Sequence, residues 1–279
     1  MKIQSLNIYS YKPNFGINLQ SKKLQFKEDD FYVRIKGYGH HSGWAKKIIE
    51  TADKTVNFIR QICNFEETIK QVTNGVIDAN KLISTDKEKQ IHTGILRTKR
   101  MGWNNKSGWD SSTGLITPYS KNPKNRYRCY SDRLDYTVKH PLNNPFYIEL
   151  TRPVHEKDSG KFIEHGNGKY IHTSFSIIDK IYNKLYTNFI LNEVKEENLT
   201  DVNNSIAEIR WILAHATPWE RGSDAISNTF MRSIYKAMGI KAYPLKKGVS
   251  LDLEAYCTNL DDYKNKFTEY FTKKPKIID

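Results

Sequence analysis

The spacing of apolar residues predicts a chain built mainly from helices. Over residues 42–63 the apolar positions recur every three or four residues, and Ser42 is placed to cap this amphipathic run. The same spacing predicts a second helix over 174–192. Residues 65–85 are expected to form two shorter helices, because the turn signal Asn74-Gly75 lies between them. Each amphipathic segment predicts one face turned toward a core.

The last third of the chain contains the clearest helix boundaries. Ser205 and Glu208 have the spacing of a capping box, and the helix that they begin is expected to end before Pro218. Ser223 is expected to cap the next helix, whose apolar row ends at Gly239. These signals predict two consecutive helices joined by a short connection.

The remaining segments are shorter and less regular. A further turn is expected near Ser250 and a terminal helix over 261–271. Residues 98–125 are rich in turn-forming residues, which indicates either a functional loop or a mobile one. The predicted strands are 31–35, 127–131, 146–150 and 169–172. The pattern as a whole predicts a mainly α fold with a few short β-strands, in a single domain over 1–279.

The charge of the chain favours acidic partners. Lys and Arg number 44 against 31 Asp and Glu, which gives a formal net charge of +13. Nucleotides, nucleic acid and anionic membrane surfaces would all be attracted. The alternative is a generally cationic surface set by compositional bias, because the positive charges cluster only in the tail KKPK at 273–276. We therefore expect no specific nucleic-acid ligand.

The sequence shows no membrane or disulfide pattern. Cys63, Cys129 and Cys257 are far apart and odd in number, so we expect free thiols and no metal site. No run approaches the roughly 18 apolar residues of a membrane span, and the first residues form no secretory signal. Position 2 is not glycine, so we expect no N-myristoylation. We expect a monomer without a transmembrane segment that, if secreted, needs no cleaved signal.

An anion-binding loop is predicted within TPWERGSDAISNTF. Arg221, Gly222 and Ser223 stand at the expected helix start, where free backbone amides and the helix dipole attract negative charge. The guanidinium group adds a geometry suited to phosphate or carboxylate. The alternative is that Arg221 pairs with Asp224 or Glu220.

A second candidate site is HGNGKYIH. Two glycines flank Asn167, and glycine permits a ligand to approach the backbone closely. His165, Lys169 and His172 are within reach of such a ligand. The alternative is an ordinary Gly-Asn-Gly hairpin turn.

Two further segments carry candidate ligand contacts. Thr117, Lys121 and Lys124 could contact phosphates, or they could belong to a solvated turn. The carboxylate of Asp252, in an otherwise apolar run, could accept hydrogen bonds from ribose hydroxyls or base amines, or be a first-turn helix acid.

Common catalytic motifs are missing from the sequence. It contains no HExxH, no GxSxG and no GxxxxGK[ST], so metalloprotease, serine hydrolase and P-loop readings have no support. HPLNNPF at 140–146 is similar to the start of a Fic motif but lacks its GNG at the required spacing. GNGK at 166–169 supplies that second half, yet Lys161 stands in the place of the catalytic histidine.

Taken together, these stretches resemble the AvrB family of bacterial type III effectors, which have a Fic/Doc-like (Fido) fold. The resemblance spans 115–267, is strongest over 206–267 and does not cover the first hundred residues. The matching positions are Trp211, Ala216, Pro218, Arg221, Gly222, Ser223, Gly239, Ile240, Pro244, Gly248, Asp252, Glu254 and Ala255. The resemblance implies a Fido-like helical bundle with an extra α/β lobe.

The resemblance also implies a nucleotide-binding cleft. The family's nucleotide-contacting threonine, arginine and aspartate match Thr117, Arg221 and Asp252. No match is found for its additional arginine and histidine contacts, nor for the N-terminal lipidation signal of the plant-pathogen members. The candidate catalytic residues are His165, as a base, and Asp252. The expected nucleotide-binding set is Thr117, Lys121, Asn167, Arg221, Gly222, Ser223 and Asp252.

The implied activity is group transfer inside a host cell. The resemblance suggests transfer of a deoxyhexose such as rhamnose from a UDP- or dTDP-sugar to a threonine or serine hydroxyl of a host protein. ADP or ATP is the alternative ligand, and transfer of AMP or UMP the alternative reaction. A non-catalytic docking protein that binds a nucleotide and host signalling proteins is the alternative from another class, and a basic nucleic-acid-binding protein is a third.

Overall fold

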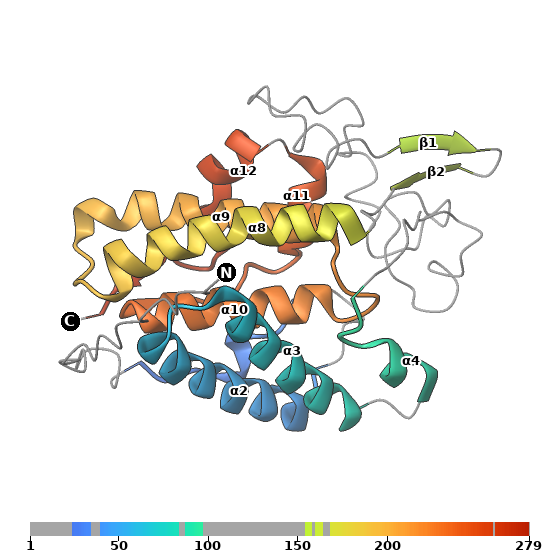
Figure 1. Ribbon diagram of the computed structural model, residues 1–279, viewed down its shortest axis with the longest axis horizontal. Helices are drawn as coiled ribbons and strands as arrows, with labels where there is room; N and C mark the ends of the chain where they lie inside the picture. The colour runs from blue at the N-terminus through green and yellow to red at the C-terminus, as the bar shows by residue number, and fades with distance from the viewer. Residues whose placement is uncertain are drawn as a thin grey trace, which may run out of the picture.

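The fold consists of long helices that lie side by side (Figure 1). The computed structural model describes residues 24–34, 40–83, 87–96, 154–157, 160–163, 168–258 and 260–278. The long helices are α2 (Ser42–Gln61), α3 (Phe65–Lys81), α8 (Gly168–Leu185), α9 (Leu199–Ala216) and α10 (Ser223–Ala237). The mainly α fold predicted from apolar spacing is confirmed, whereas its Fido-like arrangement stays a prediction.

Helix α10 lies at the centre of the bundle, between the α2–α3 pair and α9 (Figure 1). Every residue over 226–235 is buried. Polar side chains inside such a helix must find partners. The hydroxyl of Ser233 donates to the carbonyl of Thr229 at 2.8 Å, and the hydroxyl of Thr229 donates to the carbonyl of Ala225 at 2.8 Å. These bonds allow short polar residues to occupy the middle of the core.

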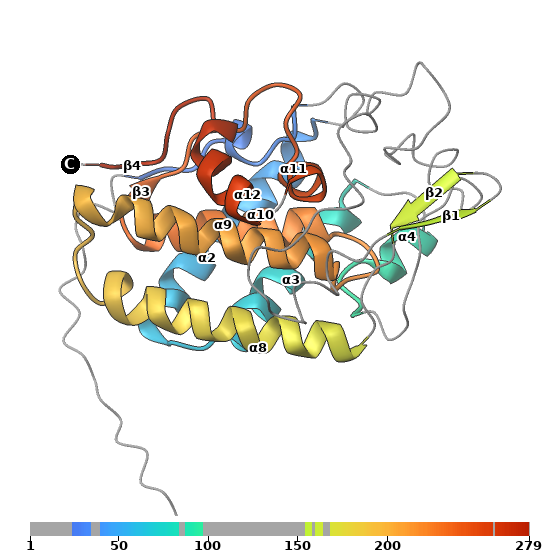
Figure 2. The same cartoon turned by 90° about the horizontal axis from the view of Figure 1, so that it is seen from above.

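Short elements complete the fold. Helices α11 and α12 pack on α9, above the long helices in Figure 2. Strands β1 and β2 form one antiparallel pair, and β3 and β4 form another. Their bounds are α4 (Lys87–His92), β1 (Val154–Lys157), β2 (Gly160–Ile163), β3 (Ile240–Lys241), α11 (Leu251–Cys257), α12 (Leu260–Lys266) and β4 (Lys276–Ile277). Single turns of 3-10 or π helix lie at Glu28–Asp30, Tyr186–Ile190, Glu196–Asn198 and Phe267–Tyr270.

The prediction of two helices over 65–85 is wrong, because α3 continues through Asn74-Gly75 without a break. Gly75 serves packing rather than a turn. A Cβ atom added to Gly75 would lie 2.2 Å from Oγ1 of Thr51 on α2. Only a residue without a side chain permits this approach of the two helices.

Two of the predicted helix caps are also wrong. Ser42 is the first residue of α2, and its hydroxyl donates to the Glu28 carboxylate at 2.7 Å instead of capping the helix. Ser205 and Glu208 lie inside α9, which begins at Leu199. The Glu208 carboxylate instead pairs with Lys264 of α12 at 3.2 Å. In both places a tertiary partner replaces the local one that the pattern suggests.

Two of the predicted strands are not strands. Residues 31–34 have no regular structure, and 169–172 belong to the first turns of α8. The predicted strands 127–131 and 146–150 lie outside the described residues. The helix stop at Gly239 is confirmed, because this residue follows α10 with φ +75°.

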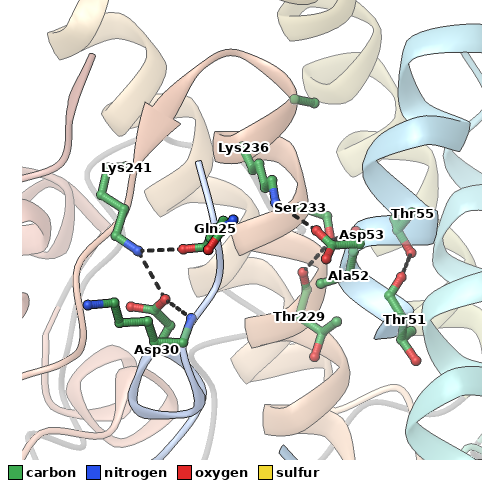
Figure 3. Close-up of polar contacts among 12 residues, drawn as sticks. Gln25, Asp30, Thr51, Ala52, Asp53, Thr55, Thr229, Ser233, Lys236 and Lys241 are labelled. Carbon is green, nitrogen blue, oxygen red and sulfur yellow. Dashed lines mark hydrogen bonds and ion pairs between the residues drawn. The ribbon is translucent and has the colours of Figure 1, made fainter. Parts of the chain in front are cut away.

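The first described segment is fastened to the end of α10. Lys241 of β3 forms an ion pair with the buried Asp30 at 3.0 Å (Figure 3). Asp30 also accepts the backbone N–H of Lys27 at 2.8 Å. Beside it, Lys236 of α10 pairs with Asp53 of α2 at 2.7 Å (Figure 3). Both ion pairs lie at the C-terminal end of α10. The predicted anion-binding loop lies at the opposite, N-terminal end of this helix.

Among the helices that the structure describes, none combines the length and the apolar character that a membrane crossing requires.

Candidate functional site

The loop over 217–222 turns the chain from α9 into α10. Thr217 and Gly222 both have left-handed backbones, with φ +40° and +87°. The prediction that Ser223 is the N-cap is wrong, because Gly222 occupies the N-cap and Ser223 is the first helical residue. The hydroxyl of Ser223 donates to the carbonyl of Trp219 at 3.1 Å. The start of α10 therefore has no side-chain cap.

The first backbone amides of α10 point out of the helix without an acceptor among the described residues. The first intrahelical bond runs from the N–H of Ile226 to the carbonyl of Gly222 at 2.9 Å. The N–H groups of 223–225 precede that bond and have no intrahelical partner. Together with the helix dipole they present positive charge to an anion. The free amides expected at this helix start are present although the predicted Ser223 cap is not, and anion binding there stays a prediction.

Arg221 stands directly before these amides and is half-buried. Within the described part of the chain, its guanidinium forms no ion pair, and both of the acids considered as its partners contact other side chains: Glu220 contacts His92, and Asp224 pairs with Arg210. The alternative that Arg221 merely pairs with a neighbouring acid is therefore wrong. Neither of these two acids therefore occupies the guanidinium donors of Arg221.

The residues just after α4 hold the Arg221 loop in place. The N–H of Gly94 donates to the carbonyl of Arg221 at 3.1 Å, and the N–H of Glu220 donates to the carbonyl of Ile95 at 2.8 Å. The Nδ1 atom of His92 contacts a carboxylate oxygen of Glu220. Backbone and side-chain contacts thus join two segments that are far apart in the sequence.

A buried arginine lies behind the loop. Arg210 of α9 has a side chain with 0% exposure, and its Nη2 atom donates to Asp224 of α10 at 3.0 Å and to Asp252 of α11 at 2.7 Å. The Nε and Nη1 atoms of Arg210 are buried and have no hydrogen-bond partner among the residues that the structure describes. One guanidinium therefore connects three helices at the end of the bundle where α10 begins.

Burial and mutual contact shift the protonation of this cluster. Burial raises the pKa of Asp252 to about 7, the Arg210 charge opposes the rise, and Asp224 adds to it. Burial alone would lower the pKa of Arg210, but the charges of Asp252 and Asp224 outweigh it and hold that pKa above its ordinary value. Arg210 is therefore a permanent cation, and burial beside Asp224 favours the protonated form of Asp252.

The structure brings together the segments around two of the three family-matched contacts. Asp224, three residues after Arg221, shares Arg210 of α9 with Asp252, so the start of α10 and the start of α11 meet at this arginine. Gly222 and Ser223 belong to the same loop. The other predicted site residues lie outside the described residues: Thr117, Lys121, His165 and Asn167. Their roles stay predictions.

Sequence reasoning missed Arg210 as a site residue and considered Asp224 only as a partner of Arg221. A signal for Arg210 was present, because it stands four residues after Ile206 and three before Leu213, on the apolar stripe of α9. A cation at an apolar position requires buried carboxylates as partners.

Within the described residues, no group of three or more His, Cys, Asp and Glu side chains is placed to hold a metal ion.

Comparison with known proteins places the same segments in one family. The AvrB/AvrC family, described as avirulence proteins, matches residues 123–274. The chain is 30% identical over 105 residues to Avirulence protein B of Pseudomonas savastanoi pv. glycinea, an alignment that covers 38% of this chain and 30% of that protein. Arg221 and Asp252 lie within the family match, whereas Thr117 precedes it. Since that match extends over more than half of the sequence, the chain belongs to the AvrB/AvrC family of avirulence proteins.

Proposed function

We propose that this protein is an effector that acts inside a host cell and transfers a deoxyhexose, such as rhamnose, from a nucleotide-linked donor to a threonine or serine hydroxyl of a host protein. Membership of a family of avirulence proteins supports the effector role. The single observation that carries the donor site is the uncapped start of α10 beside Arg221, whose guanidinium forms no ion pair within the described residues.

The proposed site would bind the diphosphate of a UDP- or dTDP-sugar. The N–H groups of 223–225 and the guanidinium of Arg221 would donate to phosphate oxygens. Asp252 would contact ribose or base, since 17% of its side chain is exposed while one oxygen stays on Arg210. Thr117 and Lys121 would add phosphate contacts, and the glycines that flank Asn167 would let the ligand approach the backbone there. ADP or ATP remains the alternative ligand.

In the proposed transfer, the acceptor hydroxyl oxygen forms a bond to the anomeric carbon of the sugar. The bond between that carbon and the diphosphate oxygen breaks, and the diphosphate leaves with the electron pair. Arg221 and the helix amides would stabilise the negative charge that develops on the leaving group. The hydroxyl proton would pass to a base, for which His165 is the candidate.

A thermal-shift titration with UDP, dTDP and ADP tests the binding site. We expect at least one of these nucleotides to raise the melting temperature of the wild type, with the rise lost in Arg221→Ala and partly kept in Arg221→Lys. Arg34→Ala is the matched control, because this arginine is also partly exposed but pairs with Asp29 at 2.9 Å in another part of the molecule. If no nucleotide stabilises the wild type, the proposed function is wrong.

Mass spectrometry of host-cell lysate proteins tests the reaction. Lysate is incubated with UDP- and dTDP-deoxysugars and with ATP and UTP, using wild type and Arg221→Ala. We expect an added deoxyhexose mass on a host protein only with the wild type and a sugar donor. An added nucleotide mass would instead show nucleotidyl transfer. Nucleotide binding without any adduct would leave a docking protein.

A further inference from the structure

We propose that Asp224 is a second carboxylate of the donor site, that it shares one proton with Asp252 on the buried Arg210, and that anion binding at the start of α10 requires this proton. The carboxylate pair follows from the geometry alone. The effect of the shared proton on ligand binding rests on the proposed function, in which the bound anion is the diphosphate of a nucleotide-linked donor.

The geometry places the two carboxylates next to each other. One oxygen of Asp224 and one of Asp252 both accept from the same Nη2 atom of Arg210, at 3.0 and 2.7 Å. The two residues come from the starts of different helices, α10 and α11, so no local chain connection forces the contact. Two carboxylates this close repel each other when both are ionised, and one shared proton removes that repulsion.

Charged and titratable groups on α9, α11 and α12 lie around the pair. Arg210 from α9 is fully buried and is the cation that contacts both carboxylates. Tyr263 from α12 donates its hydroxyl to the carbonyl of Leu251 at 3.2 Å, and burial raises the pKa of Tyr263, so this phenol stays neutral. Glu254 on α11 is buried as well and adds negative charge to the neighbourhood.

Two more arginines, both on or next to α10, add positive charge to this part of the molecule. Arg232 of α10 donates to the carbonyl of Ala242 at 2.8 Å, although its charge is also felt by the cluster. Arg221 stands at the start of the same helix and is assigned to the ligand. With one proton on the carboxylate pair, Arg210 and the pair are neutral together. With none, they carry one net negative charge beside the amides that would receive a phosphate.

This arrangement makes the site sensitive to pH in a defined direction. Burial raises the pKa of Asp252 to about 7, in agreement with a proton held between the two carboxylates. As pH rises through that value, the proton leaves and the new negative charge repels a bound diphosphate. Affinity for the anion is therefore expected to fall by up to about tenfold per pH unit above the pKa of the pair. Arg210 acts as a positioning residue, since its side chain is fully buried and contacts the two carboxylates.

The first arm of the test needs no ligand. In protein labelled with ¹³C at the Asp carboxyl carbons, we expect the Asp252 signal to titrate near neutral pH. In Asp224→Asn the Asp252 signal is expected to move to lower pH, because its carboxylate neighbour has lost its charge. Asp53→Asn, which removes an acid paired with Lys236 elsewhere, should leave the titration unchanged. If the Asp252 carboxyl group titrates in the ordinary acid range, the shared proton is disproved.

The second arm measures the affinity for UDP by calorimetry at pH 6 and pH 8. The protonation of free UDP contributes equally to the pH dependence of every variant. The informative quantity is therefore the difference in pH dependence between wild type and variant. From pH 6 to pH 8 we expect the affinity of the wild type for UDP to fall about tenfold more than that of Asp224→Asn. In this variant one acid is removed, so binding needs no shared proton. Equal pH ratios in the two proteins overturn the link to binding. If UDP, dTDP and ADP all fail to bind at both pH values, the proposed function fails while the carboxyl titration still decides the pair.

Discussion

Arg210 and Asp252 form a buried ion pair of 2.7 Å that joins the middle of α9 to the first turn of α11. Asp252 is thereby held in front of the start of α10, because Asp224 contacts the same guanidinium nitrogen at 3.0 Å. A fully buried arginine is costly to place in a core unless carboxylates compensate its charge. The three residues are therefore expected to depend on one another for stability as well as for position.

Replacing Arg210 by methionine is expected to destabilise the protein by about 3–5 kcal/mol, because two close carboxylates lose their shared cation. Urea unfolding followed by circular dichroism measures the effect. The triple variant with Asp224→Asn and Asp252→Asn added should recover part of the loss, since no uncompensated charge remains. A single Arg210→Met variant as stable as wild type would show that the pair contributes nothing.

The stability of the protein is expected to depend on pH through Asp252. Burial raises the pKa of this acid to about 7 in the folded protein, above its value in the unfolded chain. A raised pKa means that the folded state binds more protons than the unfolded chain. The stability that protonated Asp252 contributes is therefore complete below the unfolded pKa of about 4 and is lost as pH rises toward 7. The slope is at most about 1.4 kcal/mol per pH unit.

Comparison with Asp252→Asn isolates this contribution. The free energy of unfolding, measured in urea at pH 4.5, 6 and 7.5, is expected to fall more steeply with pH in the wild type than in the variant. The difference between the two proteins removes the contribution of all other acids. Parallel curves would mean that Asp252 titrates as an ordinary exposed carboxyl group.

The helices were predictable because their signal is repeated along the chain, whereas the boundaries depend on single contacts. The apolar rows of α2 and α10 recur over several turns, so one misplaced residue does not hide them. A serine hydroxyl has several possible acceptors. Ser42 bonds Glu28 and Ser223 bonds the carbonyl of Trp219, and neither choice is encoded in the local pattern.

The candidate site was predictable only in part for a related reason. Arg221 was recognised from the loop in which it stands and from a family resemblance. Arg210, in contrast, finds its partners Asp224 and Asp252 at sequence separations of 14 and 42 residues, so no short motif contains the cluster. The sequence does show a charged residue, Arg210, at an apolar position of a helix. This position indicates that the arginine has a buried partner, but it does not identify which residue that partner is.

Gly75→Ala is expected to destabilise the protein by about 1–3 kcal/mol, although alanine is the better helix former. The added methyl group would lie 2.2 Å from Oγ1 of Thr51, which forces α2 and α3 apart. Gly43→Ala is the matched control, because Gly43 lies in α2 with open space around it. The control is expected to be neutral or slightly stabilising in the same urea assay. Equal effects of the two substitutions would contradict the close helix contact.

Nucleotide binding is expected to depend on His92 even though this residue is not assigned to the ligand. Its ring contacts the carboxylate of Glu220, the residue directly before Arg221, and both side chains are partly exposed, at 45% and 30%. Exposed pairs of this kind contribute less than about 1 kcal/mol to stability. His92→Ala should therefore leave the urea midpoint nearly unchanged, whereas the Arg221 loop gains freedom that must be lost again when a ligand binds.

Calorimetric titration with UDP at pH 7 measures that cost, and we expect affinity for His92→Ala to be lower than wild type by about two- to fivefold. Gly94→Ala provides the contrast, because a Cβ atom there would lie 2.7 Å from Cδ1 of Ile77 in a backbone with φ +77°. Since Gly94 also donates its N–H to the carbonyl of Arg221, this variant should lose both stability and affinity. Unchanged UDP affinity in His92→Ala would show that the backbone bonds of Gly94 and Ile95 hold the loop without the side-chain contact.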